Sequence, residues 1–332
     1  MRVGVIGAGA WGTTLAILLA EKGFKVHLWA VRPSLREALS REQENARYLP
    51  GITLPSAIEP TASLKEAVAE KNLVLLAVPS HAFRQVLKGL APFFHQPSLL
   101  VSATKGLELP KGLTMSQVAK EVLPSPRLAV LSGPSFAKEV SRKLPTAVVA
   151  ASEEMEAASL TQAAFSTPSF RVYVSLDPLG VEIGGALKIV IAIAAGVADG
   201  LGLGYNARAA LIARGLAEMA RLGMAMGAKA QTFAGLAGMG DLILTATSDL
   251  SRNRQVGLML AKGIRLPEIL ASLGAVAEGI NAAKAAVTLA ERYRVEMPIC
   301  REVYAVLFEG RDPWKACETL LARDLKEEGW PL

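Results

Sequence analysis

The pattern of hydrophobic and polar positions changes once along the chain, near residue 177. Before that point, short apolar runs alternate with helix-like stretches such as 11–23 and 82–94. Several of these runs are apolar on both faces, as strands buried in a parallel sheet are. The strand candidates are residues 3–8, 25–30, 73–79, 98–104, 127–134, 146–152 and 170–175. The alternation predicts a doubly wound parallel sheet with helices between its strands.

After residue 177 the apolar positions follow a helical period, and strand candidates are almost absent. Asp177 and Pro178 make a good helix start, with aspartate as the N-cap and proline at the first helical position. We therefore predict an α/β domain over residues 1–177 and an all-helical domain over residues 178–332. No long linker, repeat or low-complexity tract separates them.

One lysine stands alone in the first helix expected after this boundary. Between Ile183 and Ala198, Lys188 is the only charged residue. Its neighbours at helical spacing are small and leave room for a close approach to the lysine: Gly184, Gly185, Ala192 and Ala195. Two interpretations are open, a lysine that extends to the surface from a buried helix and a buried group whose pKa suits proton transfer.

Composition narrows the class of protein. The chain has 332 residues, 51% hydrophobic and 20% charged, which supports two folded domains. The net charge of +6 is spread along the chain, so no nucleic-acid-binding patch is indicated, and a small anionic substrate would explain it equally well. Cys300 and Cys317 form no zinc or redox motif, as expected in a reducing cytosol. With no signal peptide and the apolar run broken by Lys188, we expect a soluble cytoplasmic protein without stable membrane insertion.

The N-terminal segment VGVIGAGAWGTTLAILLAEKG contains a glycine motif of the G-x-G-x-x-G type. It follows a predicted strand and opens a predicted helix. Gly7 permits the tight turn, Gly9 allows a pyrophosphate to approach the backbone, and Gly12 allows the helix to pack on the strand. The anion would then lie at the helix N-terminus. This context predicts a dinucleotide site.

The end of the second predicted strand bears on which dinucleotide binds. Sites that prefer NAD usually have an acidic residue there for the ribose hydroxyls. Here the strand ends in Trp29-Ala30-Val31-Arg32, with no acid. Because Arg32 could hold a 2′-phosphate, NADP(H) is favoured, and NAD(H) remains an alternative.

Four further stretches carry polar residues beside strands, turns or helix starts. Lys105 follows an apolar strand in SATKGLE, and Asp241 follows a glycine-rich turn in GLAGMGDLILT. Glu278 opens a helix in VAEGINAAKAA. The other candidates are the turn residues Gly133, Ser135 and Ala137 and the cluster Ser251, Arg252 and Asn253. Arginine with asparagine suits a phosphate, and a carboxylate such as Asp241 could orient a lysine. No metal-ligand cluster and no Ser/His/Asp or Cys/His arrangement is evident.

These motifs together resemble one family, the bacterial NAD(P)-dependent glycerol-3-phosphate dehydrogenases. The resemblance runs in order from residue 1 to about residue 300. It rests on the stretches GAGAWGTTLA, AVPSHAFRQVL, SATKGLE, LSGPSFAKEV, GGALK, IAAGVADGLGLG, GLAGMGDLILT and TSDLSRNR. It implies a Rossmann domain followed by a helical substrate domain. It also implies interconversion of dihydroxyacetone phosphate and sn-glycerol 3-phosphate for phospholipid synthesis, and it is compatible with a homodimer.

The resemblance also implies roles for individual residues. Lys188 resembles the proton donor and acceptor, with Asp241 beside it and Lys105 touching both substrate and cofactor. The remaining substrate contacts implied are Gly133, Ser135, Ser251, Arg252 and Asn253. The cofactor contacts implied are Gly7, Gly9, Ala10, Trp11, Gly12, Arg32, Lys105, Ala137, Arg252, Val276 and Glu278.

The chain departs from the family pattern at three positions. Ile189 follows the catalytic lysine where asparagine is common, Tyr205 replaces an aspartate, and Ala246 replaces a cysteine.

Three other functions are alternatives to a glycerol-3-phosphate dehydrogenase. A β-hydroxyacid or 6-phosphogluconate-type dehydrogenase would favour a carboxylate site over the SRNR cluster. A catalytically silent nucleotide sensor could have lost Lys188 or Asp241, yet both remain. An assembly scaffold would not explain Lys105.

Overall fold

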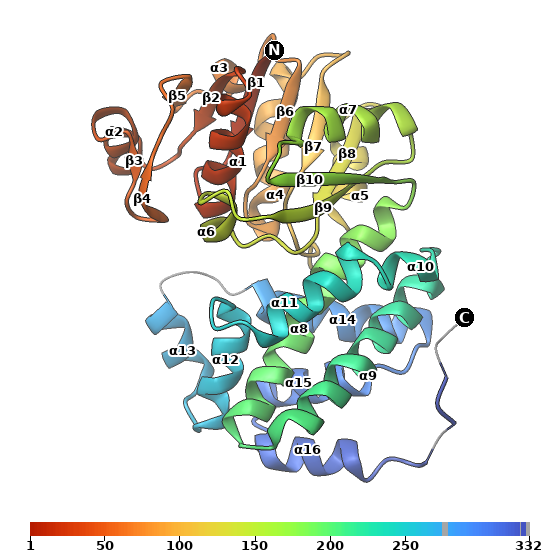
Figure 1. Cartoon of the computed structure of the whole chain (residues 1–332). Coiled ribbons are helices and arrows are strands. Elements are labelled where there is room, and N and C mark those ends of the chain that lie inside the picture. Colours follow the sequence, from red (N-terminus) through yellow and green to blue (C-terminus); the bar gives the residue numbers. More distant parts are fainter. Residues whose placement is uncertain (274–277, 326, 330–332) are drawn as a thin grey trace. The chain divides into compact units, whose positions relative to one another are not determined.

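The computed structural model describes residues 1–273, 278–325 and 327–329. The chain forms two compact units (Figure 1). The first unit comprises residues 1–104 and 115–178, and the second comprises residues 105–114 and 179–332. The structure thus assigns residues 105–114 to the helical unit, whereas the sequence analysis drew a single boundary at residue 177.

The first unit is built on an eight-stranded sheet in the order β10-β9-β8-β7-β6-β1-β2-β5. All seven predicted strands are present, and the sheet is parallel except where β8 pairs with β9 in antiparallel register. The sequence analysis missed β5. The strands are β1 (Arg2–Ile6), β2 (Lys25–Trp29), β5 (Ile58–Thr61), β6 (Leu73–Leu76), β7 (Leu99–Ser102), β8 (Arg127–Ser132), β9 (Thr146–Ala151) and β10 (Phe170–Ser175).

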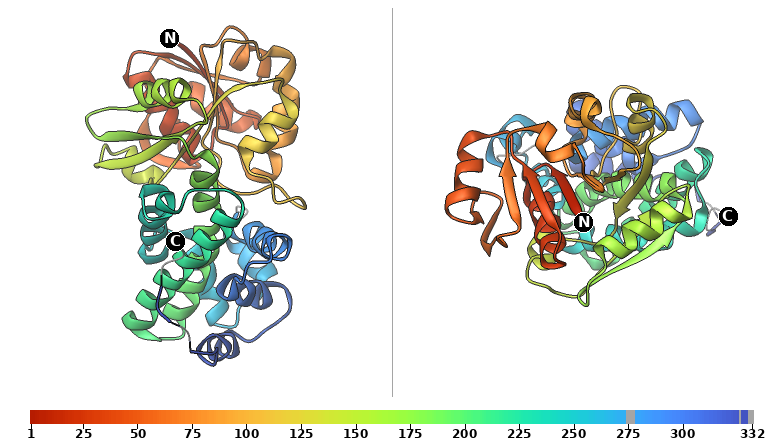
Figure 2. Two further views of the ribbon diagram at one scale, coloured as in Figure 1. Left: turned by 90° about the vertical axis from the view of Figure 1, so that its right-hand side faces the viewer. Right: turned by 90° about the horizontal axis from the view of Figure 1, so that it is seen from above.

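Helices cover both faces of this sheet (Figure 2, left). On one face α1, α6 and α7 pack together, and on the other α3, α4 and α5 do. A short antiparallel hairpin of β3 (Glu44–Asn45) and β4 (Leu49–Thr53) is inserted between β2 and β5. The helices are α1 (Ala10–Glu21), α2 (Pro33–Arg41), α3 (Leu64–Val68), α4 (Ser80–Leu90), the 3₁₀ turn η1 (Ala91–Phe93), α5 (Met115–Val122), α6 (Ala137–Val140) and α7 (Met155–Phe165).

The described part of the second unit is helical around one long buried helix. This helix, α8 (Pro178–Gly200), begins at the predicted proline and is buried along most of its length. Around it lie α9 (Gly204–Ala225), α10 (Ala230–Phe233), the π-helical turn η2 (Leu236–Gly240), α11 (Asp241–Thr247), α12 (Arg252–Ala261), α13 (Leu266–Leu273), α14 (Glu278–Tyr293), α15 (Pro298–Phe308) and α16 (Pro313–Leu321). The predicted Rossmann-type sheet followed by a helical domain is confirmed.

Helix α8 is apolar on nearly every side because it is the core of its unit. Among the described residues it is the one helix long and apolar enough to cross a membrane, and 94% of its most apolar stretch is buried in the protein. Residues 105–114 pack onto the same unit. Leu107 belongs to its apolar core, and Gly112 lies so close to Leu289 of α14 that a Cβ there would come within 2.9 Å.

Candidate active site

The isolated lysine of α8 is buried and bound to the predicted aspartate. Lys188 Nζ lies 2.9 Å from Asp241 Oδ1, and Lys105 Nζ lies 2.7 Å from Asp241 Oδ2. The side chains of Asp241 and Lys188 are 1% and 7% exposed, whereas that of Lys105 is 22% exposed. One carboxylate therefore bridges two ammonium groups, of which the more exposed is Lys105. Three residues separated by up to 136 positions in the sequence meet at one point.

The small residues near Lys188 permit this meeting. A Cβ on Gly184 would lie 2.7 Å from the carbonyl oxygen of Ala237, so the backbone of η2 lies directly against α8. Asp241 is the first residue of α11 and follows η2 without a break. The close approach expected from the small neighbours is thus made by the segment that carries the aspartate.

Charge and burial act in opposite directions on the two buried groups. Burial lowers the pKa of Lys188, Asp241 offsets part of this effect, and the charge of Lys105 adds to it, so that the pKa is lowered to about 8. Burial alone would raise the pKa of Asp241, yet the charges of Lys105 and Lys188 outweigh it and the pKa is lowered. At neutral pH the site thus holds an ionised carboxylate and a lysine that can gain or lose a proton.

A fourth residue of this cluster was not predicted. Thr245 Oγ1 lies 2.6 Å from Lys188 Nζ and donates to the backbone carbonyl of Asp241 at 2.7 Å. Its hydroxyl proton is therefore used, and its oxygen accepts from the lysine. The signal available in the sequence is spacing, because a residue four positions after Asp241 lies on the same face of a helix.

The second polar cluster lies at the N-terminus of α12. Ser251 is the N-cap, and its hydroxyl accepts from the backbone N–H of Arg254. Arg252 is the first helical residue and is exposed. Asn253 Oδ1 accepts from the backbone N–H of Gly279 at 3.2 Å, which joins α12 to the start of α14 beside Glu278. The structure thus brings the predicted cluster and Glu278 together, whereas Val276 lies outside the described residues.

The glycine loop of the first unit has the geometry that a bound pyrophosphate requires. Gly7 has φ +119°, and a Cβ on Gly12 would lie 1.9 Å from the carbonyl oxygen of Gly7. By contrast, a Cβ on Gly9 would meet nothing within 4 Å, so its backbone faces open space at the start of α1. Among the described residues no hydrogen-bond partner reaches the buried Nε1 of Trp11. These residues fit a dinucleotide.

A buried asparagine holds this loop from the β3–β4 hairpin, and the sequence analysis missed it. Asn45 Nδ2 donates to the carbonyl oxygen of Ala8 at 3.0 Å and to Thr13 Oγ1 at 2.7 Å. Its own carbonyl accepts from the backbone of Tyr48. A lone asparagine in a polar stretch carries no sequence signal for such a role.

Arg32, which follows β2, and Arg47, in the turn between β3 and β4, contact the same tyrosine. Arg32 donates to Tyr48 Oη at 2.9 Å, and the guanidinium of Arg47 lies over the Tyr48 ring, 5.4 Å from its centroid. Both arginines lie in the first unit, as the glycine loop does. This arrangement fits an adenosine that carries a 2′-phosphate.

The remaining predicted residues of the first unit lie between β8 and α6. Gly133 has φ +139° and packs against Val148, and Ser135 Oγ donates to the carbonyl of Gly133 at 2.9 Å. Ala137 opens α6, which packs on α1, the helix that begins with Ala10 and Trp11. The described candidate residues therefore divide between the units: the glycine loop, Arg32 and the β8–α6 residues lie in the first, and the lysine–aspartate cluster, the start of α12 and Glu278 lie in the second.

Comparisons with known proteins agree with this arrangement. Residues 2–158 match the family described as NAD-dependent glycerol-3-phosphate dehydrogenase N-terminus, and residues 177–318 match its C-terminus. The glycerol-3-phosphate dehydrogenase [NAD(P)+] of Geobacter sulfurreducens is 55% identical over 99% of both chains, and that of Moorella thermoacetica is 51% identical over 98% of this chain and 97% of its own.

The chain belongs to the NAD-dependent glycerol-3-phosphate dehydrogenase family. Its fold agrees, because the crystal structure of glycerol-3-phosphate dehydrogenase from Coxiella burnetii superimposes with a TM-score of 0.94 at 39% identity, over 97% of this chain and 99% of that one. The predicted family and the predicted class, an NAD(P)-dependent oxidoreductase, are confirmed.

The three departures from the family pattern have different surroundings. Ile189 is 4% exposed and belongs to the apolar core of the helical unit. Its side chain has no polar group, and the hydrogen bonds of Lys188 are instead made to Asp241 and Thr245. Ala246 is also buried in that core. Tyr205 lies at the surface, with the Arg208 guanidinium 5.0 Å from its ring centroid. Only Ile189 adjoins the lysine.

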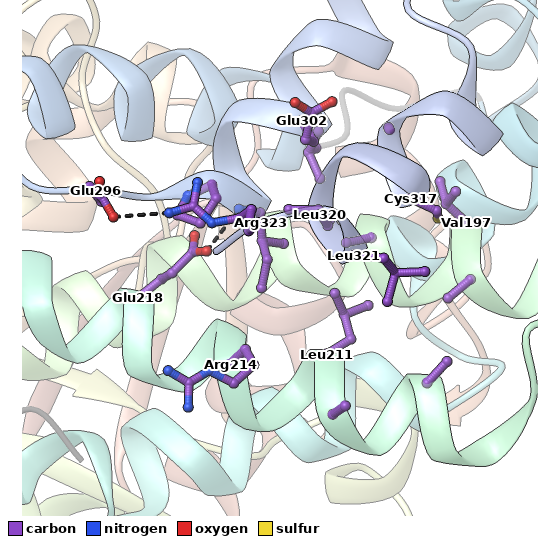
Figure 3. Close-up of a pocket in the computed structure, with 18 of the residues that line it drawn as sticks. Val197, Leu211, Arg214, Glu218, Glu296, Glu302, Cys317, Leu320, Leu321 and Arg323 are labelled. Atoms are coloured by element: carbon purple, nitrogen blue, oxygen red, sulfur yellow. Dashed lines mark hydrogen bonds and ion pairs between the residues drawn. The ribbon is translucent and has the colours of Figure 1, made fainter. Parts of the chain in front are cut away.

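The helical unit also contains a cavity of about 850 Å³ that none of the candidate residues lines. Its walls come from α8, α9, α15, α16 and the segment after α16 (Figure 3). Apolar side chains such as Leu211 and Leu320 line it, together with the buried carboxylate of Glu218.

Proposed function

We propose that this member of the family interconverts dihydroxyacetone phosphate and sn-glycerol 3-phosphate, with Lys188 as proton donor and acceptor. The observation that carries the proposal is the buried bridge between Lys188, Asp241 and Lys105. Reduction of a ketone requires a hydride, a proton for the oxygen and a way to hold the rest of the substrate. When bound, the nicotinamide supplies the hydride.

Lys188 supports the proton step by both geometry and charge. Its ammonium has three protons, and two of them are directed at Asp241 Oδ1 and Thr245 Oγ1. The third can donate to the oxygen of the substrate carbonyl. A pKa of about 8 lets the same group return as the base in the reverse direction near neutral pH.

Lys105 contributes a second positive charge at the same carboxylate. Because it is more exposed than Lys188, its ammonium can reach a ligand while it remains bound to Asp241. A cation beside the developing alkoxide stabilises the transition state. We assign Lys105 to both substrate and cofactor.

The substrate phosphate is assigned to the N-terminus of α12. Backbone N–H groups at the start of a helix favour an anion, and Arg252 and the Asn253 amide can add side-chain donors. We assign Ser251, Arg252 and Asn253 to the phosphate and Gly133 and Ser135 to the substrate. Ala137, Val276 and Glu278 are assigned to the cofactor, with Arg252 near both ligands. We further propose a cytoplasmic enzyme without membrane insertion, compatible with a homodimer.

NADP(H) is proposed as the preferred cofactor, because Arg32 and Arg47 flank Tyr48 and no acid ends β2. Arg32→Ala should raise KM for NADPH about 10-fold and leave KM for NADH within about twofold, since only NADPH carries the 2′-phosphate. Initial rates with each cofactor measure this. Equal changes for both cofactors would remove Arg32 from the 2′-phosphate site.

Cofactor oxidation with dihydroxyacetone phosphate tests the activity itself. The purified protein is mixed with NADPH or NADH and either dihydroxyacetone phosphate or unphosphorylated dihydroxyacetone, with Lys188→Ala as the inactive control. Turnover that depends on the phosphate and on Lys188 supports the proposal. NADPH binding without turnover would contradict it. That result would favour a nucleotide sensor, with Ile189 as the departure to examine first.

A further inference from the structure

Arg254 is a buried arginine that the proposed chemistry does not use. It lies in the first turn of α12, and its side chain is 11% exposed. Its Nε donates to Asp199 Oδ2 at 2.8 Å, its second terminal nitrogen lies 2.7 Å from the same oxygen, and its first donates to Asp249 Oδ1 at 2.7 Å. All three nitrogens of the guanidinium are therefore bound to carboxylates, so Arg254 acts through other residues.

The two aspartates come from different segments around the active site. Asp199 lies in the last turn of α8, the helix that carries Lys188. Asp249 lies in the loop between α11, which begins at Asp241, and α12. A planar guanidinium can join two carboxylates in a defined geometry, which an ammonium cannot do. Arg254 thus ties α12 to the lysine helix and to the end of the aspartate helix.

The backbones of α8 and α12 touch at the same place. A Cβ on Gly257 would lie 2.1 Å from the carbonyl oxygen of Ile193, and a Cβ on Gly196 would lie 2.0 Å from the carbonyl oxygen of Arg254 itself. Glycines here let the two helices approach more closely than side chains would permit. The ion pair of Arg254 with Asp199 therefore joins the same two helices whose backbones are in contact at Gly196 and Gly257.

The N-terminus of α12 is the part that this contact orients. The backbone N–H of Arg254 donates to the capping hydroxyl of Ser251, and the next residues are Arg252 and Asn253. We propose that Arg254, anchored by Asp199 and Asp249, is a positioning residue that holds the N-terminus of α12 for the substrate phosphate. The inference rests on the proposed phosphate site and extends it to residues that touch no substrate.

Paired substrates separate positioning from a general structural role. Arg254→Gln should lower kcat/KM for dihydroxyacetone phosphate about 10- to 100-fold, as expected for a displaced binding group. The value for unphosphorylated dihydroxyacetone should change by less than about twofold, because that substrate does not use the phosphate site. Arg254→Lys keeps the charge and loses the fork, so it should recover part of the loss.

Arg208 provides a matched control. It also binds Asp199, at 3.2 Å to each oxygen, but it lies on α9. Arg208→Gln should therefore leave kcat/KM for both substrates within about twofold. A melting curve and NADPH binding verify that each variant is folded.

If Arg254→Gln does not fold, Asp249→Asn replaces it, because the Asp249 side chain is 97% exposed and its substitution should not disturb packing. This variant should lower kcat/KM about two- to threefold for the phosphorylated substrate only.

Three results would contradict the inference. Equal losses with both substrates would make Arg254 a general structural residue. Unchanged kinetics in Arg254→Gln would remove it from the site, and an equal loss in Arg208→Gln would assign the effect to Asp199 alone. Arg252→Ala, measured in parallel, tests the proposed phosphate site itself. If Arg252→Ala does not change KM for dihydroxyacetone phosphate, the phosphate assignment fails, and the inference fails with it for a different reason.

Discussion

Two carboxylates in the helical unit are almost equally buried and have opposite surroundings. Asp241 on α11 is bridged by Lys105 and Lys188. Glu218 on α9, which is 2% exposed, accepts hydrogen bonds from the backbone N–H groups of Ile299 and Cys300 at 2.7 and 3.2 Å. Those two N–H groups belong to the first turn of α15, so Glu218 satisfies donors that a helix N-terminus leaves unpaired.

The two environments shift the pKa values in opposite directions. Burial raises the pKa of Glu218, and hydrogen bonds from Ile299 and Cys300 and the charge of Arg221 offset only part of this, so that the pKa is raised to about 7. Two lysine charges overcome burial at Asp241 and lower its pKa. Burial therefore does not by itself identify a reactive carboxylate. The proton-transfer role proposed for the Asp241 site rests on the two lysine ammonium groups bound to its carboxylate.

The largest effect should come from removing the proton donor. Lys188→Ala should lower kcat about 10³-fold, because no other described group at Asp241 occupies its position. NADPH binding should persist, since the glycine loop lies in the other unit. Steady-state kinetics and a fluorescence titration with NADPH measure the two effects. A kcat within tenfold of the unaltered enzyme would exclude Lys188 as the general acid.

Neutralising each carboxylate in turn tests the comparison directly. Asp241→Asn should lower kcat about 10²-fold, because the two lysines lose their shared counterion and repel each other. Glu218→Gln, the matched change at the other carboxylate, should leave kcat within about twofold. Comparable losses in kcat from folded samples of both variants would mean that burial, and not the lysine pair, sets the requirement.

Stability should report on Glu218. Its pKa is about 7 in the folded state against 4.5 for the free group, so the folded protein binds the proton more tightly. The stabilisation is complete below pH 4.5 and is lost as pH rises through 7. The free energy of unfolding should fall by roughly 2 kcal/mol between pH 5 and 7. Urea unfolding at several pH values measures this decrease.

The pH dependence of Glu218→Gln isolates that contribution. The variant has no ionisable group at this position, so its free energy of unfolding should vary less between pH 5 and 7 than that of the unaltered protein. An identical slope in both proteins would mean that Glu218 does not titrate in this range.

The pH profile of catalysis should report on Lys188. Reduction requires protonated Lys188, so kcat/KM for dihydroxyacetone phosphate should fall above pH 8, about tenfold per pH unit. Oxidation of sn-glycerol 3-phosphate requires the neutral amine, so its rate should rise up to pH 8 and then level off. Initial rates in both directions between pH 6 and 10 measure this. Profiles that bend in the same direction would contradict the assignment of one group to both steps.

Much of the fold could be predicted because local patterns carry it. The seven predicted strands of the main sheet and the helix start at Pro178 were confirmed. Strand β5, IEPT, was missed because it is short and contains a proline, which is tolerated at the edge of a sheet. The antiparallel pairing of β8 with β9 was also missed, since strand direction depends on the path of the connection.

The sequence by itself determined the family, the glycine loop and the types of residue in the site, because these depend on local spacing and residue chemistry. Only the tertiary structure decided which groups meet. Residues 105–114 join the helical unit and bring Lys105 to Asp241. Thr245, Asn45 and Arg254 acquire these partners only on folding. Asn45 and Thr13 are 32 positions apart in the sequence, and Arg254 and Asp199 are 55 positions apart. Contacts between residues so far apart leave no periodic signal in the sequence. Whether two such residues meet depends on how the intervening helices and turns pack.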